Sequence, residues 1–113
     1  MDIESLRTIC LAFPGATEEV QWETHLLFKV GGKMFCIGNL DGTPGAAFKV
    51  PEEDFEELSA RPGIIPAPHL ARAKWIKVME TNALKPKEWK ALLQQSYDLI
   101  RAKLTKKVQA TLG

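Results

Sequence analysis

Residues 26–37 read LLFKVGGKMFCI, and this stretch decides the fold of the chain. Both halves are rich in strand-forming residues, and Gly31-Gly32 separates them. Glycine supplies the positive φ angles that the central positions of a two-residue hairpin loop need. The turn therefore predicts two antiparallel strands paired as Val30 with Lys33, Lys29 with Met34, Phe28 with Phe35, and Leu27 with Cys36.

The alternation of side chains along a strand gives this hairpin two different faces. One face is apolar and is expected to point into the core, with Phe28, Val30, Phe35 and Ile37. The other face is mixed and carries Leu27, Lys29, Met34 and Cys36. Lys33 lies at the tip of the hairpin. The pattern thus predicts a half-buried sheet and a candidate binding surface.

Composition limits the class of protein. The chain has 113 residues, of which 45% are hydrophobic and 26% charged, as in a globular protein, and we expect one domain over residues 1–113. No apolar run is long enough to span a membrane, so no membrane partner is expected. The N-terminus lacks a basic region followed by an apolar run, which argues against a secretory signal. Cys10 and Cys36 are then expected to be reduced thiols in the cytoplasm.

The net charge of +1 is unevenly distributed along the chain. Residues 1–60 hold four basic and eleven acidic residues, whereas residues 61–113 hold eleven basic and three acidic ones. The basic half suggests an anionic partner, although basic and acidic elements that lie side by side in the fold are an equally good explanation.

Helices and strands follow one another in a simple order. Asp2 is a suitable N-cap for a helix that ends at Phe13-Pro14-Gly15. After the strands, Pro51 and Pro86 are suited to the first turns of two further helices. The remaining expected segments are strands over 18–24, 46–50 and 74–79, an extended connector over 64–70, and a tail that frays after Lys107.

This order predicts an α+β two-layer sandwich, an antiparallel sheet of about five strands with helices packed on one face. The sheet side of the core is expected to contain Phe28, Val30, Phe35, Ile37, Phe48, Val50, Ile76 and Val78. The open face is expected to show Leu27, Lys29, Met34, Cys36, Lys49, Trp75, Lys77 and Met79. Such a face suits nucleic acid, a dimer or protein partner, or plain solvation.

Several segments in this order resemble the MmcQ/YjbR family. They are Phe13-Pro14-Gly15-Ala16-Thr17-Glu18, the hairpin at 29–35, the stretch from Pro62-Gly63-Ile64 to Trp75-Ile76-Lys77-Val78, and the segment 93–104. The resemblance implies a compact α+β fold similar to frataxin-like and secretion-chaperone-like folds. It also implies DNA binding through paired hairpin wings. The second wing would be the loop 38–45, which departs from this role because it has no lysine or arginine and contains Asp41.

The function expected from these observations is weak and largely sequence-independent DNA binding by the lysine-bearing hairpin and the open sheet face. Lysine and arginine would contact phosphates, and an exposed tryptophan would stack on a base. The candidate residues are Lys29, Lys33, Lys49, His69, Arg72, Lys74, Trp75 and Lys77. The alternative is a non-enzymatic interaction or dimerisation module that uses the same face, and His69 would then only hydrogen-bond nearby backbone.

Catalysis, metal binding and cofactors are not expected. Cys36 lies mid-strand without an adjacent histidine, and Cys10 lies on the apolar side of a helix, so neither is an activated thiol. The two histidines and two cysteines lack the spacing of a zinc site. The acidic run at 52–57 is similar to the iron-binding surface of frataxins, but a helix spreads its carboxylates around the axis. No nucleophile and base can be paired from the sequence.

Overall fold

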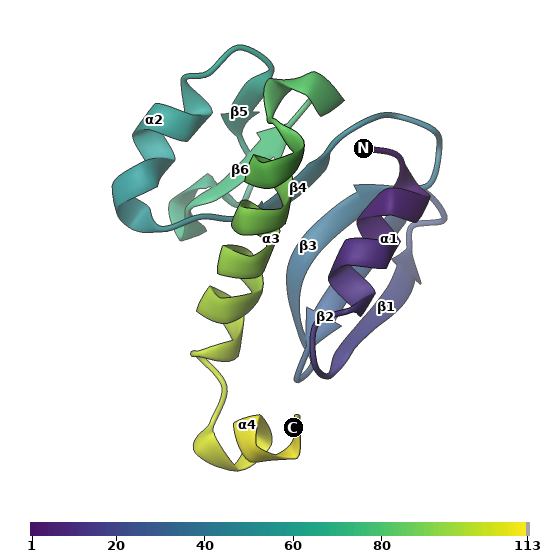
Figure 1. Cartoon of the computed structure of the whole chain (residues 1–113), viewed down its shortest axis with the longest axis vertical. Helices are drawn as coiled ribbons and strands as arrows, with labels where there is room; N and C mark the ends of the chain where they lie inside the picture. The colour runs from purple at the N-terminus through teal and green to yellow at the C-terminus, as the bar shows by residue number, and fades with distance from the viewer. Residues whose placement is uncertain (113) are drawn as a thin grey trace.

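Six strands and four α-helices build residues 1–112, the part of the chain that the computed structural model describes. The elements are α1 (Ile3–Leu11), β1 (Ala16–Gln21), β2 (His25–Val30), β3 (Lys33–Asn39), β4 (Ala46–Lys49), η1 (Glu52–Asp54), α2 (Phe55–Ser59), β5 (Ile64–Pro66), η2 (Ala71–Ala73), β6 (Trp75–Val78), η3 (Thr81–Ala83), α3 (Pro86–Arg101) and α4 (Lys106–Thr111). The strands form one antiparallel sheet in the order β1-β2-β3-β4-β6-β5. Helices α1 and α3 lie on the same side of this sheet (Figure 1).

The predicted α+β fold is confirmed, with one strand more than expected. The additional strand is β5, which lies within the segment 64–70 that the sequence predicted to be an extended connector. Pro66 ends this strand, and β5 lies at the edge of the sheet, where a missing N–H is tolerated. At the other edge, β1 begins at Ala16 and ends at Gln21, earlier than the predicted strand over 18–24.

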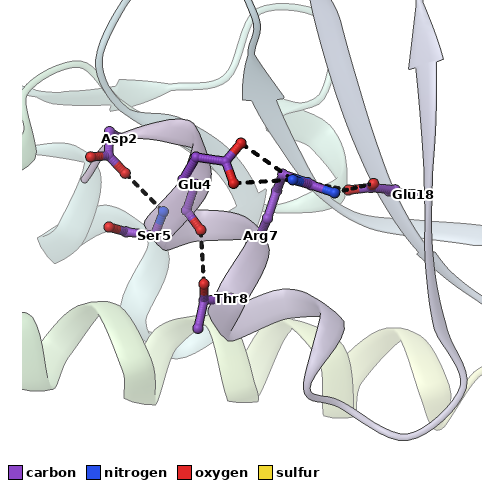
Figure 2. Close-up of polar contacts among 6 residues, drawn as sticks. All are labelled: Asp2, Glu4, Ser5, Arg7, Thr8 and Glu18. Carbon is purple, nitrogen blue, oxygen red and sulfur yellow. Dashed lines mark hydrogen bonds and ion pairs between the residues drawn. The ribbon is translucent and has the colours of Figure 1, made fainter.

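Helix α1 begins at the predicted N-cap and is tied to the edge strand β1. The Asp2 carboxylate accepts a hydrogen bond from the Ser5 backbone N–H at 2.8 Å. The Arg7 guanidinium donates two hydrogen bonds to the Glu18 carboxylate, at 2.8 and 2.7 Å, and also contacts Glu4 (Figure 2). The hydrogen bonds from Arg7 hold the pKa of Glu18 below its usual value. This link fixes α1 against β1.

The central hairpin has the predicted turn but not the whole predicted register. Val30 faces Lys33 and Lys29 faces Met34, as expected. Beyond these pairs the ladder shifts, so that Phe28 faces Cys36 and Phe35 is an extra residue in β3. This β-bulge allows Phe35 and Cys36, although adjacent, both to be fully buried.

The bulge reverses the faces of β3 beyond Phe35. The predictions that Cys36 lies on the open face and Ile37 in the core are therefore wrong. Cys36 belongs to the helix-side core, and Ile37 is half-buried on the opposite face. The other predicted sheet residues of the core are confirmed as buried, namely Phe28, Val30, Phe35, Phe48, Val50, Ile76 and Val78.

Ser96 of α3 replaces a strand-to-strand hydrogen bond just beyond the bulge. Pairing between β3 and β4 stops at Cys36 with Phe48. The Ser96 hydroxyl then donates to the Phe35 carbonyl at 2.6 Å and accepts from the Lys49 N–H at 3.0 Å. The side chain is fully buried, so helix α3 bridges the two strands through this hydroxyl.

Helix α4 continues to Thr111, so the prediction that the chain frays after Lys107 is wrong for the residues described up to Leu112. Thr105 caps α4 by accepting a hydrogen bond from the Val108 N–H at 3.2 Å. Leu104 is buried, and Val108 packs against the core. Both side chains lie beside Gly31, where a Cβ would come within 2.6 Å of Leu104. Burial of these apolar groups against the hairpin turn holds the tail in place.

Candidate binding sites

The sheet face opposite α1 and α3 carries a groove with a volume of about 670 Å³. Its floor contains the side chains of Leu27, Met34, Ile37 and Ala47, which the strand registers place on this face. The full lining is Gln21, Trp22, His25, Leu27, Lys29, Gly32, Met34, Ile37, Asn39, Ala46, Ala47, Ala67, Pro68, His69, Leu70 and Lys77. The groove is therefore an apolar depression with polar groups around it.

One wall of the groove is the segment between β5 and β6, and this segment explains the position of Trp75. The Ala67 N–H donates to the Trp75 carbonyl at 3.0 Å, and the Trp75 N–H donates to the Leu70 carbonyl at 3.2 Å. The chain thus closes a loop directly beside Trp75. The tryptophan is only 4% exposed, so the prediction that it is available for stacking on a base is wrong. The alternation of side chains along β6 predicts the correct face of the sheet for Trp75. It does not reveal the loop between β5 and β6 that covers this residue.

The burial of Trp75 makes its substitution by a charged residue costly. We expect Trp75→Glu to lower the free energy of unfolding by several kcal/mol, because it places an unpaired charge in a buried position. Met34→Glu, at a half-buried site on the same face, is expected to cost about 1 kcal/mol or less. Urea unfolding of the two variants measures both effects. Equal stability of Trp75→Glu and wild type would contradict the buried position.

Left-handed backbone occurs in both walls of the groove. Trp22, in the turn after β1, has φ 52°, and His69, in the opposite wall, has φ 66°. Such angles are unusual for residues other than glycine and cost free energy. The Trp22 side chain is 74% exposed, and its ring lies edge-on to His25 with 5.8 Å between the centroids. Both residues lie in turns, and Glu23, which follows Trp22 in the turn between β1 and β2, has a similar φ of 61°.

The charged side chains that line the groove are all basic. None of the residues that line it is acidic. Lys29 forms an ion pair with Glu19 of β1, which neutralises it. Lys77 lies across the ladders from Ala47 and Ile65, and it has no ion pair within residues 1–112. Lys77 is therefore the cation that the groove offers to a ligand.

A second cationic site, the lysine patch, consists of Lys49, Lys74 and Lys103. The Lys49 ammonium donates to the Ala73 carbonyl, and the Lys74 ammonium lies 5.1 Å from the centroid of the Phe55 ring. Burial lowers the pKa of Lys49, and the nearby ammonium groups of Lys103 and Lys74 lower it further, while Glu52 acts in the opposite direction. Lys49, at the end of β4, thus lies near both Lys74, which follows η2, and Lys103, which follows α3.

Comparison with known families and solved structures identifies the family of this chain. The model of the YjbR family matches residues 11–99, which is most of the chain. The chain belongs to the YjbR family. This YjbR chain is 30% identical to the Deinococcus radiodurans protein DR2400, which carries a DUF419 domain; the match covers 99% of this chain and 88% of that one, with a TM-score of 0.88. A Pseudomonas syringae protein shares the fold at 23% identity, with a TM-score of 0.72 over 88% of this chain and 99% of that one. No curated protein matches the sequence.

The predicted site residues of the YjbR chain fall into separate groups. Lys49 and Lys74 lie together in the lysine patch, and Arg72 is exposed nearby on η2. His69, Lys29 and Lys77 line the groove. Lys33 is exposed alone at the hairpin tip. Their contacts with DNA remain predictions.

Sequence reasoning missed Lys103, Trp22 and His25 as site residues. Lys103 lies in the turn that follows α3, which ends at Arg101. Its approach to Lys49 depends on how α3 packs against β4, where Ser96 contacts Lys49. Trp22 was expected within a strand, and its position in a turn at the end of the groove depends on where β1 ends.

The loop expected as a second wing folds on itself. The Thr43 N–H donates to the Asp41 carboxylate at 2.9 Å, and the hydrogen bonds from Thr43 lower the pKa of Asp41. Asp41 is therefore a carboxylate at neutral pH, held at the surface of the loop between β3 and β4. A negative charge in this position opposes contact with a phosphate.

The thiols of Cys10 and Cys36 are packing groups. Both are fully buried. Burial raises the pKa of Cys36 well above its usual value, and the neighbouring Cys10 raises it further. A protonated, inaccessible thiol is a poor nucleophile.

Within residues 1–112, no three histidine, cysteine or acidic side chains are grouped as metal ligands would be. None of the helices described is both long and apolar enough to cross a membrane.

Proposed function

We propose that this YjbR-family chain binds DNA weakly and largely without sequence preference, through the lysine patch of Lys49, Lys74 and Lys103. The observation that supports this most is the position of Lys49, whose ammonium donates to the Ala73 carbonyl next to Lys74 and whose pKa is lowered by burial and by the nearby ammonium groups of Lys103 and Lys74. Exposed Arg72 extends the patch along η2. Lys33 at the hairpin tip is the wing residue that would contact a neighbouring phosphate. The role is non-catalytic, and we place it in the cytoplasm, where buried thiols stay reduced.

The physical basis is the repulsion within the patch. Like charges that lie close together raise the free energy of the protein, and an anion between them removes this penalty. DNA phosphates supply such anions at regular spacing, and lysine contacts them without reading the base sequence. Because Lys29 is already paired with Glu19, it is expected to contribute less than the patch.

The salt dependence of binding tests this proposal. Phosphate contacts release counterions, so the logarithm of the affinity should fall with the logarithm of salt concentration by about 0.9 per neutralised phosphate. We expect Lys49→Gln with Lys103→Gln to reduce that slope by about two and to leave sequence preference unchanged. Fluorescence anisotropy with labelled duplexes of two unrelated sequences, at low and moderate salt, measures both quantities.

Lys90→Gln is the matched control, because Lys90 is an exposed lysine in the first half of α3. It should bind like wild type. The DNA proposal fails if wild type does not bind at low salt, or if the double variant binds as tightly and with the same slope as wild type.

A further inference from the structure

We propose that the groove on the open sheet face binds a small amphipathic carboxylate, a molecule with an apolar body and one anionic head. The apolar body would lie on the floor of the groove, and the carboxylate would pair with Lys77. This site is separate from the lysine patch, and binding there is non-covalent. It gives the YjbR chain a small-molecule ligand in addition to the proposed DNA.

The size and lining of the groove suit such a molecule. A volume of about 670 Å³ lies within the roughly 300–1,000 Å³ that is usual for small-molecule sites. Met34, Ile37 and Ala47 offer a continuous apolar floor, and Pro68 and Leu70 belong to one wall. Burial of an alkyl or aryl group against these side chains supplies the main part of the affinity.

The charge of the groove selects the head group. No acidic residue lines the groove, and Glu19, which lies on the same face across from Leu27, is paired with Lys29. The neighbours of Lys77 across both ladders, Ala47 and Ile65, carry no charge that would neutralise it. Lys77 is a half-buried residue beside apolar side chains, so its attraction to a carboxylate is screened less than it would be in open water. Because Lys29 is already paired with Glu19, a ligand with one anionic charge is enough to pair with Lys77.

The exposure of Trp22 provides a further argument for a ligand. Trp22 lines the groove, and this residue is 74% exposed. An apolar body in the groove would cover the exposed indole, which otherwise remains in contact with water.

The experiment compares decanoate with 1-decanol, which has the same chain length but no charge. Isothermal titration calorimetry of the full chain measures both affinities. Since a hydrogen bond to a charged group contributes about 1.5–3 kcal/mol, we expect Lys77→Met to weaken decanoate by about tenfold or more and to leave decanol unchanged. Met34→Glu should abolish decanoate binding, because it places a negative charge on the floor.

The control variants separate this site from the lysine patch. Lys90→Met should bind decanoate like wild type, and so should Lys49→Gln with Lys103→Gln. Thermal melts by circular dichroism verify that each variant is folded. If Met34→Glu does not fold, Lys77→Met alone decides the result.

Three outcomes would overturn the proposal. The first is a wild type that binds no decanoate, and the second is a Lys77→Met variant that binds it as tightly as wild type does. The third is a wild-type dimer in sedimentation velocity that Met34→Glu converts to a monomer, because a second copy of the chain would then occupy the groove. A failure of DNA binding leaves the carboxylate proposal unaffected, since the two sites use different lysines.

Discussion

Replacing Phe35 by alanine is expected to lower the free energy of unfolding by about 3–5 kcal/mol. The side chain is fully buried and packs against two other rings, with centroids 5.4 Å from Tyr97 and 5.9 Å from Phe13. Removing it leaves a cavity between the hairpin and α3 and also removes these aromatic contacts. Urea unfolding followed by circular dichroism measures the change.

A comparison of neighbouring residues tests the bulge itself. In the observed register Cys36 is buried and Ile37 is half-buried on the open face. We therefore expect Ile37→Ser to be much milder than Cys36→Asp, which places a charge in the core. The regular register would reverse this order. A Phe35→Ala variant with an unchanged melting transition would contradict the core position of Phe35, which both registers share.

Replacing Ser96 by alanine is expected to cost about 2–4 kcal/mol, although it removes only one oxygen atom. Without the hydroxyl, the Phe35 carbonyl and the Lys49 N–H both lose their partner at a fully buried position. Each unsatisfied buried group costs about 1–3 kcal/mol. Hydrogen exchange should also show faster exchange at the Lys49 amide, because β3 and β4 are no longer bridged there.

Gln95→Ala is the control for this effect, since Gln95 is the exposed neighbour on the same helix. Its stability should lie within about 0.5 kcal/mol of wild type. If Ser96→Ala proves no less stable than Gln95→Ala, the hydroxyl is not the bridge between the strands.

Local chemistry made several elements predictable. Asp2 is a helix cap in any context that offers a free N–H three residues later, and Ser5 provides it. Gly31-Gly32 forms a tight hairpin because both residues accept positive φ. The strands near 46–50 and 74–79 follow from alternation of apolar residues. These signals depend on residues close together in the chain, so a sequence reveals them.

The candidate sites were less predictable because they depend on contacts between distant segments. Lys49 and Lys103 become neighbours only when α3 packs on β4. The burial of Trp75 depends on a loop closed by Ala67 and Leu70. No alternation of apolar and polar residues encodes either contact. The sequence indicated candidate lysines in both halves of the chain, but not which of them would meet.

The sequence by itself determined the α+β class, the central turn and the family to which the chain belongs. Only the tertiary structure decided which side of the sheet Cys36 and Ile37 occupy, because one bulged residue at Phe35 reverses the alternation beyond it. That reversal moves Ile37 into the groove and Cys36 into the core. The alternation of apolar and polar residues does not predict a bulge. The extra residue, Phe35, packs against Phe13 and Tyr97, which are distant in the chain.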